Sequence, residues 1–328
     1  THGVTPVLID TDPGIDDALA LLLALVSPEL RVLAVTTVSG NVPVHTATRN
    51  TFTVLSRLPA ATAVPVAEGA ARPCRGEPVY AAHIHGEDGL GEVARLRDET
   101  GRRRYPPLEI ALSPRRAADE ILYQIRRSPQ PVTLIALGPL TNVADALEKD
   151  PQTVNRLERL VIMGGAVAVS GNITAAAEFN FYVDPEAARR VFASGLPITL
   201  VPLDVTQQVV LARHHLPAAV SGSPSRIAQF VMDVTRRAFT LAEDHQGRPE
   251  IFLHDPLAIG AVIDPTLVST RPLPVEIETR GTLTRGLSVA DRRLIRAERK
   301  PPPNAAVGLS VQSRRFLSLF SERLLCPP

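Results

Sequence analysis

The 328-residue sequence has no tryptophan, only two cysteines and almost no net charge. Two cysteines are too few for a disulfide framework or a thiolate metal site. Thirty-five basic residues against 34 acidic ones leave a charge of +1, which gives no reason to expect nucleic acid or an anionic membrane as a partner. The longest apolar run, residues 18–26, is far shorter than the ~20 residues of a membrane span. With no basic-then-apolar leader visible, we expect a soluble cytoplasmic protein.

Short β-branched apolar segments alternate with helical segments along the first two thirds of the sequence. The expected strands are 4–10, 31–39, 131–137, 160–163 and 197–203, and the expected helices are 13–27, 142–149 and 185–194. Strands that are apolar on both faces and alternate with helices predict an α/β fold with an open, mostly parallel, doubly wound (Rossmann-like) sheet. Such sheets bind ligands at the carboxyl ends of their strands. No repeat or composition shift marks a boundary, so we expect a single domain over residues 1–328.

The remaining segments carry other signals. Residues 69–107 are rich in Gly, Pro and Arg and predict a long functional loop. Helical periodicity covers residues 230–243 and, at the far end, 310–325. Between them, residues 274–278 and 287–290 predict an antiparallel pair.

Four carboxylates lie within eight residues where the first strand turns into the first helix: Asp10, Asp12, Asp16 and Asp17. Asp12 before Pro13 is typical of a helix cap, and acids in the first turn favour the helix dipole. Capping explains one or two acids but not four, because like charges so close together resist joint ionisation. A bound cation removes that repulsion, and clustered aspartates suit Ca²⁺ or Mg²⁺.

The segment DTDPGIDDALAL (10–21) resembles the N-terminal signature of the inosine–uridine-preferring nucleoside hydrolases, which cleave the N-glycosidic bond of ribonucleosides. Further motifs of that family follow in order: VSGN (38–41), HGEDGLG (85–91), ALGPLTN (136–142), VIMGG (161–165), GN (171–172), AEFNFYVDPEAA (177–188), LHDPLA (253–258) and TRGLSVAD (284–291). The resemblance covers most of the chain. It implies an open, mostly parallel sheet with surrounding helices and one tightly held Ca²⁺.

The resemblance also implies roles around the ion. Asp12, Asp17, Asp255 and the main-chain carbonyl of Leu137 would be calcium ligands. Asp12 would take a proton from a calcium-bound water, with Asn41 orienting both. Without the resemblance, Asp255 would read equally well as an Asp-Pro helix cap and Asn41 as a turn asparagine.

A second implied set holds the ribose. Asp16 would bind a ribose hydroxyl, while Asn172, Glu178 and Asn180 would bind the 2′-, 3′- and 5′-hydroxyls, with Met163 near the 5′ end. A sugar needs several convergent polar groups. We expect Glu178 and Asn180 to share one face of an extended segment, although surface polarity alone would also explain them.

The base pocket is less defined. His254 would donate a proton to the leaving base as an imidazole charged near neutral pH, and His85 would contact the base. Packing of the strand end is the alternative for His254. Some family members place tyrosines on the helix before the LHDP-like motif or stack purines on tryptophan, whereas this chain offers only Phe239 near the expected position. The preferred base therefore stays open.

Two other functions compete. A haloacid-dehalogenase-type phosphatase would use Asp10 as nucleophile, but neither Lys149 nor Lys300 is placed as its auxiliary base. A nucleoside- or ribose-binding protein without catalysis would not need the intact aspartate set. We therefore expect a calcium-dependent ribonucleoside hydrolase of purine and pyrimidine salvage. Its partner would be a small-molecule ribonucleoside, and the family suggests a homodimer or homotetramer.

Overall fold

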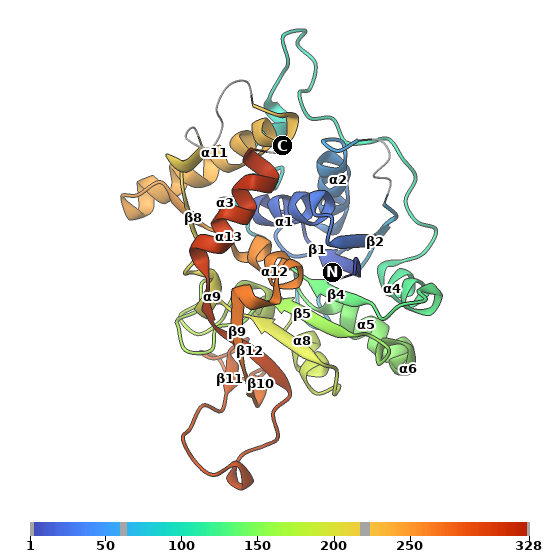
Figure 1. Cartoon of the computed structure of the whole chain (residues 1–328), viewed down its shortest axis with the longest axis vertical. Helices are drawn as coiled ribbons and strands as arrows, with labels where there is room; N and C mark the ends of the chain where they lie inside the picture. Colours follow the sequence, from blue (N-terminus) through green and yellow to red (C-terminus); the bar gives the residue numbers. More distant parts are fainter. Residues whose placement is uncertain (1–2, 60–63, 217–223, 327–328) are drawn as a thin grey trace.

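The computed structural model describes residues 3–59, 64–216 and 224–326, and within them an eight-stranded sheet has the order β3-β2-β1-β4-β5-β6-β12-β9 (Figure 1). Its neighbours are parallel except β12 and β9, which run antiparallel. The strands are β1 (Thr5–Thr11), β2 (Leu30–Thr37), β3 (Val66–Glu68), β4 (Thr133–Ala136), β5 (Arg159–Met163), β6 (Ile198–Val201), β9 (Val268–Leu273) and β12 (Ala305–Val311). The predicted α/β class with an open, mostly parallel sheet is confirmed.

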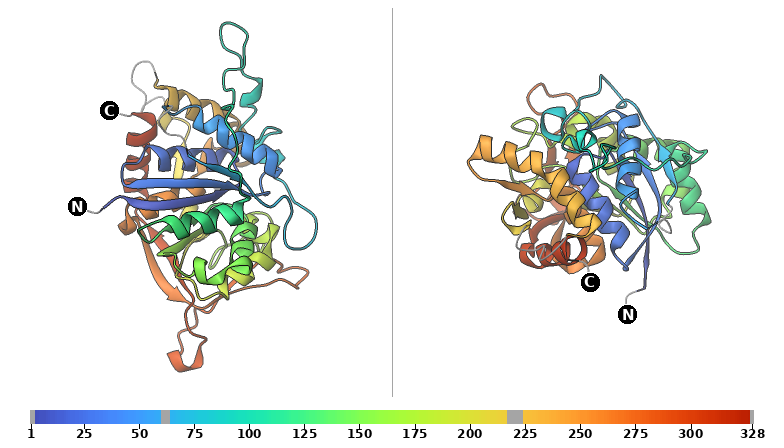
Figure 2. Two further views of the ribbon diagram at one scale, coloured as in Figure 1. Left: turned by 90° about the vertical axis from the view of Figure 1, so that its right-hand side faces the viewer. Right: turned by 90° about the horizontal axis from the view of Figure 1, so that it is seen from above.

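Helices cover both faces of this sheet and create two separate apolar cores (Figures 1 and 2). One core takes side chains from α1 (Ile15–Val26), α11 (Arg226–Gln246), α12 (His254–Ile263) and α13 (Ser313–Phe320). The other takes them from α4 (Ala117–Arg127), α5 (Thr141–Lys149) and α8 (Pro185–Phe192). The other helices are α2 (Val44–Leu55), α3 (Ala82–His85), α6 (Pro151–Val154), α7 (Phe179–Val183) and α9 (Leu203–Thr206).

Smaller elements complete the chain. Two-stranded sheets pair β7 (Val210–Ala212) with β8 (Glu250–Phe252) and β10 (Val275–Ile277) with β11 (Ser288–Ala290). The second pair is the predicted antiparallel one. Short 3₁₀ turns span Val93–Arg95, Pro265–Leu267 and Ala297–Arg299, and a π-helical turn spans Ser321–Leu325.

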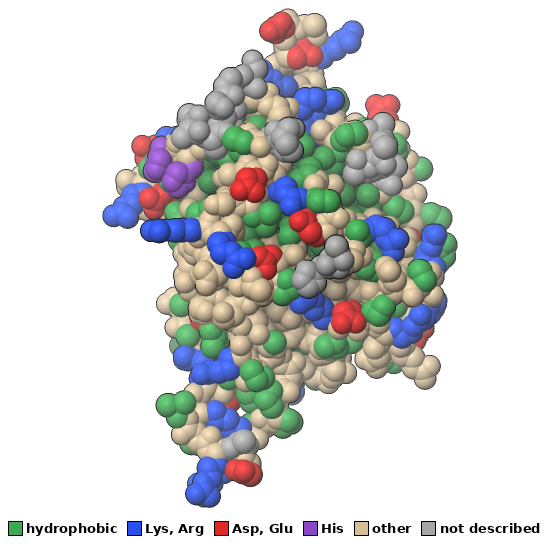
Figure 3. Space-filling model, viewed as in Figure 1, with side chains coloured by type: hydrophobic (Ala, Val, Ile, Leu, Met, Phe, Trp, Pro, Cys, Tyr) green, Lys and Arg blue, Asp and Glu red, His purple; other side chains and the backbone are tan. Residues whose placement is uncertain are grey.

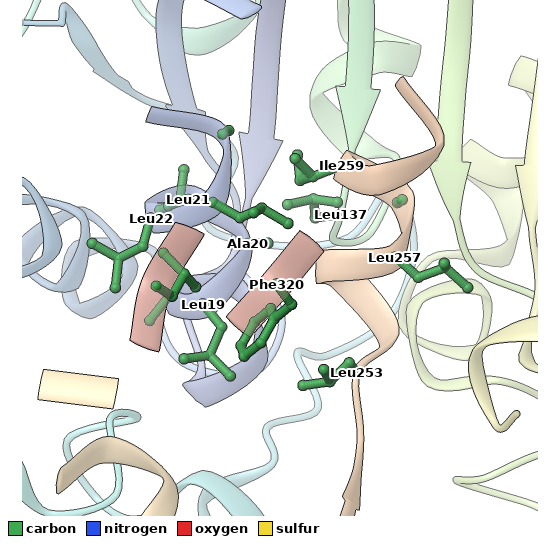
Figure 4. Packing of buried hydrophobic residues seen from close by; sticks show 14 of the residues in the cluster. Leu19, Ala20, Leu21, Leu22, Leu137, Leu253, Leu257, Ile259 and Phe320 are labelled. Carbon is green, nitrogen blue, oxygen red and sulfur yellow. The ribbon is translucent and has the colours of Figure 1, made fainter. Parts of the chain in front are cut away.

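Helix α1 runs through the larger core and is apolar nearly all round, as a fully buried helix must be. Its residues 18–24 have almost no exposed surface, and they pack against α12 and the C-terminal segment (Figure 4). Leu19, Leu257 and Phe320, which come from three distant parts of the sequence, belong to this one core. The packing holds the first turn of α1, with its two aspartates, in a fixed place at the carboxyl edge of the sheet.

The sequence predictions fail at several elements. The predicted helix over 310–325 is wrong at its start, because residues 305–311 form β12 inside the sheet and α13 begins only at Ser313. Helices α2 and α4 and the short strand β3 were not predicted at all. The loop 69–107 contains α3 and a 3₁₀ turn.

On the face seen in Figure 3, acidic and basic side chains are interspersed. This face therefore shows no large patch of one charge sign that would attract an oppositely charged partner. Among the described helices, none combines the length and the hydropathy that a membrane crossing needs.

Candidate active site

The carboxyl ends of β1, β2 and β4 bring three predicted site residues to one edge of the sheet. Asp10 on β1 lies between Thr36 of β2 and Ala136 of β4, so the chain leaves all three strands at the same level. Asp12, Asn41 and Leu137 follow these strand ends. The backbone N–H of Asn41 donates to Oδ2 of Asp12 at 2.7 Å.

Asp17 is held by a shell of donors at the start of α1. Its Oδ1 accepts from the Thr11 hydroxyl at 2.6 Å, and its Oδ2 accepts from Nδ2 of Asn41 at 3.0 Å and from the N–H of Gly14 at 3.3 Å. These bonds close the first turn of α1, where the helix dipole also favours an anion. They leave the carboxylate fixed and buried beside Asp12.

Helix α12 delivers the fourth carboxylate from the other end of the chain. The N–H of Asp255 donates to Oδ2 of Asp16 at 2.7 Å, which ties the first turn of α12 to the first turn of α1. Burial, and then the charges of the neighbouring aspartates, raise the pKa of Asp255 well above its usual range. Burial likewise raises the pKa of Asp12, assisted by Asp17, and it raises the pKa of Asp16 to about 8. The cluster is therefore under strong repulsion without a cation.

The donor set fits a hard cation. Oδ1 of Asp12 is buried and has no hydrogen-bond partner, which is costly unless a ligand completes it. Gly40 and Gly138 flank this carboxylate so closely that a Cβ on either would collide with it. Only oxygen donors converge, as Ca²⁺ prefers. Across the described ranges, no group of three or more His, Cys, Asp or Glu side chains is already arranged as a metal site, so binding would require the carboxylates to adjust.

Glu178 and Asn180 do not lie on an extended segment, and that prediction is wrong. Glu178 is the N-cap of α7, and its carboxylate accepts from the N–H groups of Gly165, Asn180 and Phe181. The capping pattern decides the local structure because a glutamate side chain satisfies free N–H groups of the first turn. Burial raises the pKa of Glu178 to about 7 in spite of these bonds.

Asn180 connects two strand ends. Its Nδ2 donates to the carbonyl of Leu137 at 2.8 Å and to the carbonyl of Met163 at 3.0 Å. The Leu137 carbonyl, the predicted main-chain ligand, therefore points toward the same site and keeps a second lone pair.

A cavity of about 500 Å³ opens above this edge of the sheet. Most of the predicted residues line it, whereas Asp12 and Asp17 lie buried outside its lining. The predicted residues in the lining are Asp16, Asn41, His85, Leu137, Met163, Asn172, Glu178, Asn180, His254 and Asp255. Helix α11, strand β8 and helix α3 form the side that lies away from Glu178 and Asn180.

Both predicted histidines are partly buried and engaged in hydrogen bonds. Nδ1 of His85 accepts from the N–H of Ile15 at 3.0 Å, so this ring caps α1. Nδ1 of His254 lies 2.7 Å from the Thr206 hydroxyl. Burial lowers the pKa of each imidazole to about 4, and for His254 the charge of His85 adds to this. The expectation that His254 is charged near neutral pH is therefore wrong, because desolvation disfavours the cation.

Phe239 does not line the cavity, and its predicted contact with the base is wrong. Its side chain is 1% exposed and packs into the core, with the Arg213 guanidinium over its ring. The predicted helix is present as α11, but Phe239 lies on the face of it that packs into the core. Two residues that sequence reasoning missed are at the cavity instead: Phe252, which lines it, and Thr206, which holds His254. Phe252 stands two residues before His254, and this proximity is the only signal that pointed to it.

Asp10 does not face the cavity either. Its carboxyl is 0% exposed, and Oδ1 accepts from Thr36 and from Nδ2 of Asn142. These bonds tie the Asp10 carboxylate to β2 and α5, and a carboxylate engaged in this way is a poor nucleophile, which argues against the competing phosphatase function. Asp184 is the N-cap of α8, where its carboxylate accepts from the N–H of Ala187 at 3.0 Å.

The cavity combines buried carboxylates, polar side chains suited to the hydroxyls of a sugar, and histidines. This combination is typical of a hydrolytic enzyme for a small polyhydroxylated substrate. The chain is a member of the inosine-uridine preferring nucleoside hydrolases, whose sequence profile matches residues 7–318. It therefore hydrolyses the N-glycosidic bond of ribonucleosides, releasing ribose and free base.

Three relatives agree in length and fold. The chain is 38% identical over 325 residues to the pyrimidine-specific ribonucleoside hydrolase RihA of Salmonella gallinarum, covering 97% of this chain and 98% of the relative. The solved structure of the plant nucleoside hydrolase PpNRh1 superposes with a TM-score of 0.87 at 34% identity, covering 98% and 99% of the two chains. A purine-preferring ribonucleoside hydrolase from Gardnerella vaginalis gives 0.86 at 30%, covering 98% of each chain.

Proposed function

We propose that this ribonucleoside hydrolase works with one Ca²⁺ held by Asp12, Asp17, Asp255 and the carbonyl of Leu137. The unpartnered, buried Oδ1 of Asp12 is the observation that carries the proposal. The mutual repulsion of the carboxylates and their all-oxygen chemistry support it. A bound divalent ion would lower the pKa of a water and orient it for attack.

Asp12 is the general base in this proposal. Its Oδ2 accepts from the N–H of Asn41, and its Oδ1, which would bind the ion through one lone pair, keeps a second lone pair for the proton of the attacking water. Asn41 fixes the carboxylate through its backbone and, through its side chain, also binds Asp17. The attack at the anomeric carbon would pass through an oxocarbenium-like transition state, as in other glycosyl transfers.

The ribose would bind between the carboxylates and α7. Asp16 and Asn172 line the cavity beside Glu178 and Asn180, and Met163 closes the same region. The side chain of Asn172 already accepts from the N–H of Phe179 at 2.9 Å, which leaves its amide hydrogens for a hydroxyl oxygen.

The base would leave toward α11, β8 and α3. His254 and His85 both line this part of the cavity. As a neutral imidazole, His254 would assist by donating a hydrogen bond from its Nε2–H to the departing base when Nδ1 accepts from Thr206. His85 uses Nδ1 for the Ile15 N–H, so only its Nε2 remains for the base.

A ribose-release assay across purine and pyrimidine ribonucleosides, run with and without chelator, tests this proposal. We expect chelation, checked by elemental analysis, to abolish turnover and added Ca²⁺ to restore it. The metal-free enzyme should also melt at a lower temperature, because a ligand at 100 times its Kd stabilises the folded state by ~2.7 kcal/mol. Full activity in demonstrably metal-free protein would refute the calcium part alone.

Assembly and compartment are further proposals from the family likeness. We propose one hydrolase domain over residues 1–328, a homodimer or homotetramer, a cytoplasmic location and a role in salvage. Light scattering at several concentrations measures the assembly directly.

A further inference from the structure

Phe252 exposes an aromatic ring inside the cavity. It is the last residue of β8, and its side chain is 37% exposed, whereas the next residue, Leu253, is fully buried. The ring belongs to the lining of the cavity. This large apolar ring is therefore not covered by the core but faces a concave site that also carries polar groups. Such a position is typical of a ligand contact.

The position of Phe252 places it on the side of the departing base. Its ring centroid lies 5.7 Å from that of His254, with the two planes at 54°. Strand β8 is held between β7 and α11, so the ring stands on a fixed backbone. Helix α11 lines the same cavity with Ala238, Leu241, Ala242, His245 and Gln246.

The other Phe or Tyr ring of the described lining is Phe179, and it stands between Glu178 and Asn180 on the ribose side. The chain has no tryptophan, and Phe239 points into the core. Away from the ribose side, Phe252 is thus the phenyl ring that the described lining offers to a planar leaving group, beside the imidazoles of His83, His85, His245 and His254.

Resting on the proposed function, we propose that the base of the bound ribonucleoside stacks on Phe252. This makes Phe252 a specificity-determining residue for planar aromatic bases. Stacking of a base on an aromatic side chain changes affinity roughly 10- to 100-fold. A bicyclic purine overlaps the ring over a larger area than a pyrimidine, so purine ribonucleosides depend on Phe252 more.

The test compares Phe252→Ala, Phe252→Leu and Phe252→Tyr with the parent holoenzyme on inosine and uridine. Inhibition by free ribose, which has no base, reports the rest of the site. We expect Phe252→Ala to lower kcat/KM for inosine roughly 10- to 100-fold, mostly through KM, and for uridine by less. Phe252→Tyr should restore the parent value, Phe252→Leu only part of it, and the Ki of ribose should not change. Leu283→Ala, a large exposed apolar side chain outside the cavity, is the matched control.

Melting temperatures separate these effects from misfolding. The inference is overturned if folded Phe252→Ala keeps the parent kcat/KM for inosine within about twofold, if Phe252→Leu does as well as Phe252→Tyr, or if the Ki of ribose rises in step with KM. Each of these results leaves the hydrolase function standing, because the parent still releases ribose. A parent that releases ribose from no nucleoside would instead refute the proposed function itself.

Discussion

The N–H of Asp255 donates to Oδ2 of Asp16 at 2.7 Å, joining two residues that stand 239 positions apart in the sequence. Asp16 thus satisfies a free N–H group in the first turn of α12, a role that the side chain of a helix's own N-cap residue usually has. The same carboxylate lines the cavity, so one side chain both faces the ribose and fixes the helix that supplies Asp255.

Removing this cap should therefore damage stability and activity together. We expect Asp16→Ala to cost ~0.5–2 kcal/mol of unfolding free energy, as for other lost caps. It should also lower kcat/KM by more than 10-fold. Asp16→Asn keeps an acceptor oxygen and should recover the stability but not the activity. Asp264→Ala, which removes a cap at a 3₁₀ turn outside the cavity, serves as control for thermal melts and ribose release. Parent-like behaviour of Asp16→Ala in both assays would contradict the double role.

Asp12→Asn should separate catalysis from folding. Loss of a general base typically costs ~10²- to 10⁴-fold, and weaker ion binding adds to that loss. The amide keeps an acceptor for the Asn41 N–H, so circular dichroism should show an intact fold. A variant that retains bound calcium and a near-parent kcat would show that another group is the base.

Glu178 predicts a pH dependence of stability. Its pKa is about 7 in the folded protein and 4.5 in the unfolded chain, so the unfolded state releases the proton first as pH rises. Its contribution to stability is therefore complete below pH 4.5 and is lost as pH rises through 7. Glu178→Gln cannot ionise, so its stability relative to the parent should improve by up to ~3 kcal/mol over that window. Chemical denaturation at pH 4.5 and pH 7.5 measures this, and a constant difference would contradict it.

Asn180→Ala should weaken ribose binding and loosen the Leu137 carbonyl. Loss of a hydrogen bond to a buried group costs ~1–3 kcal/mol. We expect kcat/KM to fall for every ribonucleoside by a similar factor, because the sugar is common to all. A loss confined to one base would move Asn180 out of the ribose site.

His254→Ala distinguishes assistance to the leaving base from simple packing. The p-nitrophenolate of a p-nitrophenyl riboside leaves as a stable anion without a hydrogen-bond donor, whereas the natural bases need such a donor. Because the variant loses one hydrogen bond to the leaving base, its kcat/KM should fall roughly 10- to 100-fold on nucleosides and little on the activated riboside. Thr206→Val, which removes the hydroxyl next to Nδ1, should reproduce part of the same selective loss. Equal losses on both substrates would assign His254 a structural role.

The sequence indicated the central α/β architecture because its parallel strands are buried on both faces and give long apolar runs. It did not indicate β12, since residues 305–311 alternate less clearly and gain their place only by pairing with β6 and β9. Helix α4 was not predicted either, although its apolar residues recur at helical spacing and form its buried face.

For the site, the residues predicted from the motifs include ten of the 25 that line the cavity, but the motifs could not give the orientation of the side chains. Phe239 and Phe252 are both aromatic residues that precede the LHDP segment. Tertiary packing decides that the ring of Phe239 enters the core and that the ring of Phe252 lines the cavity. The neutral state of His254 likewise follows from burial, which no local sequence pattern reports.

The interior position of β12 has a consequence for biosynthesis. A nascent chain that has emerged only to residue 304 carries β6 with an open edge and β9 with no partner in the sheet, because β12 joins both. It also lacks residues 313–325, which cover α1, and the ion pair between Arg323 and Glu29. Exposed strand edges and apolar helices of this kind invite aggregation. The central sheet is therefore completed only when residues 305–311 are available, and until then the unpaired edges of β6 and β9 are the parts of an incomplete chain most open to aggregation.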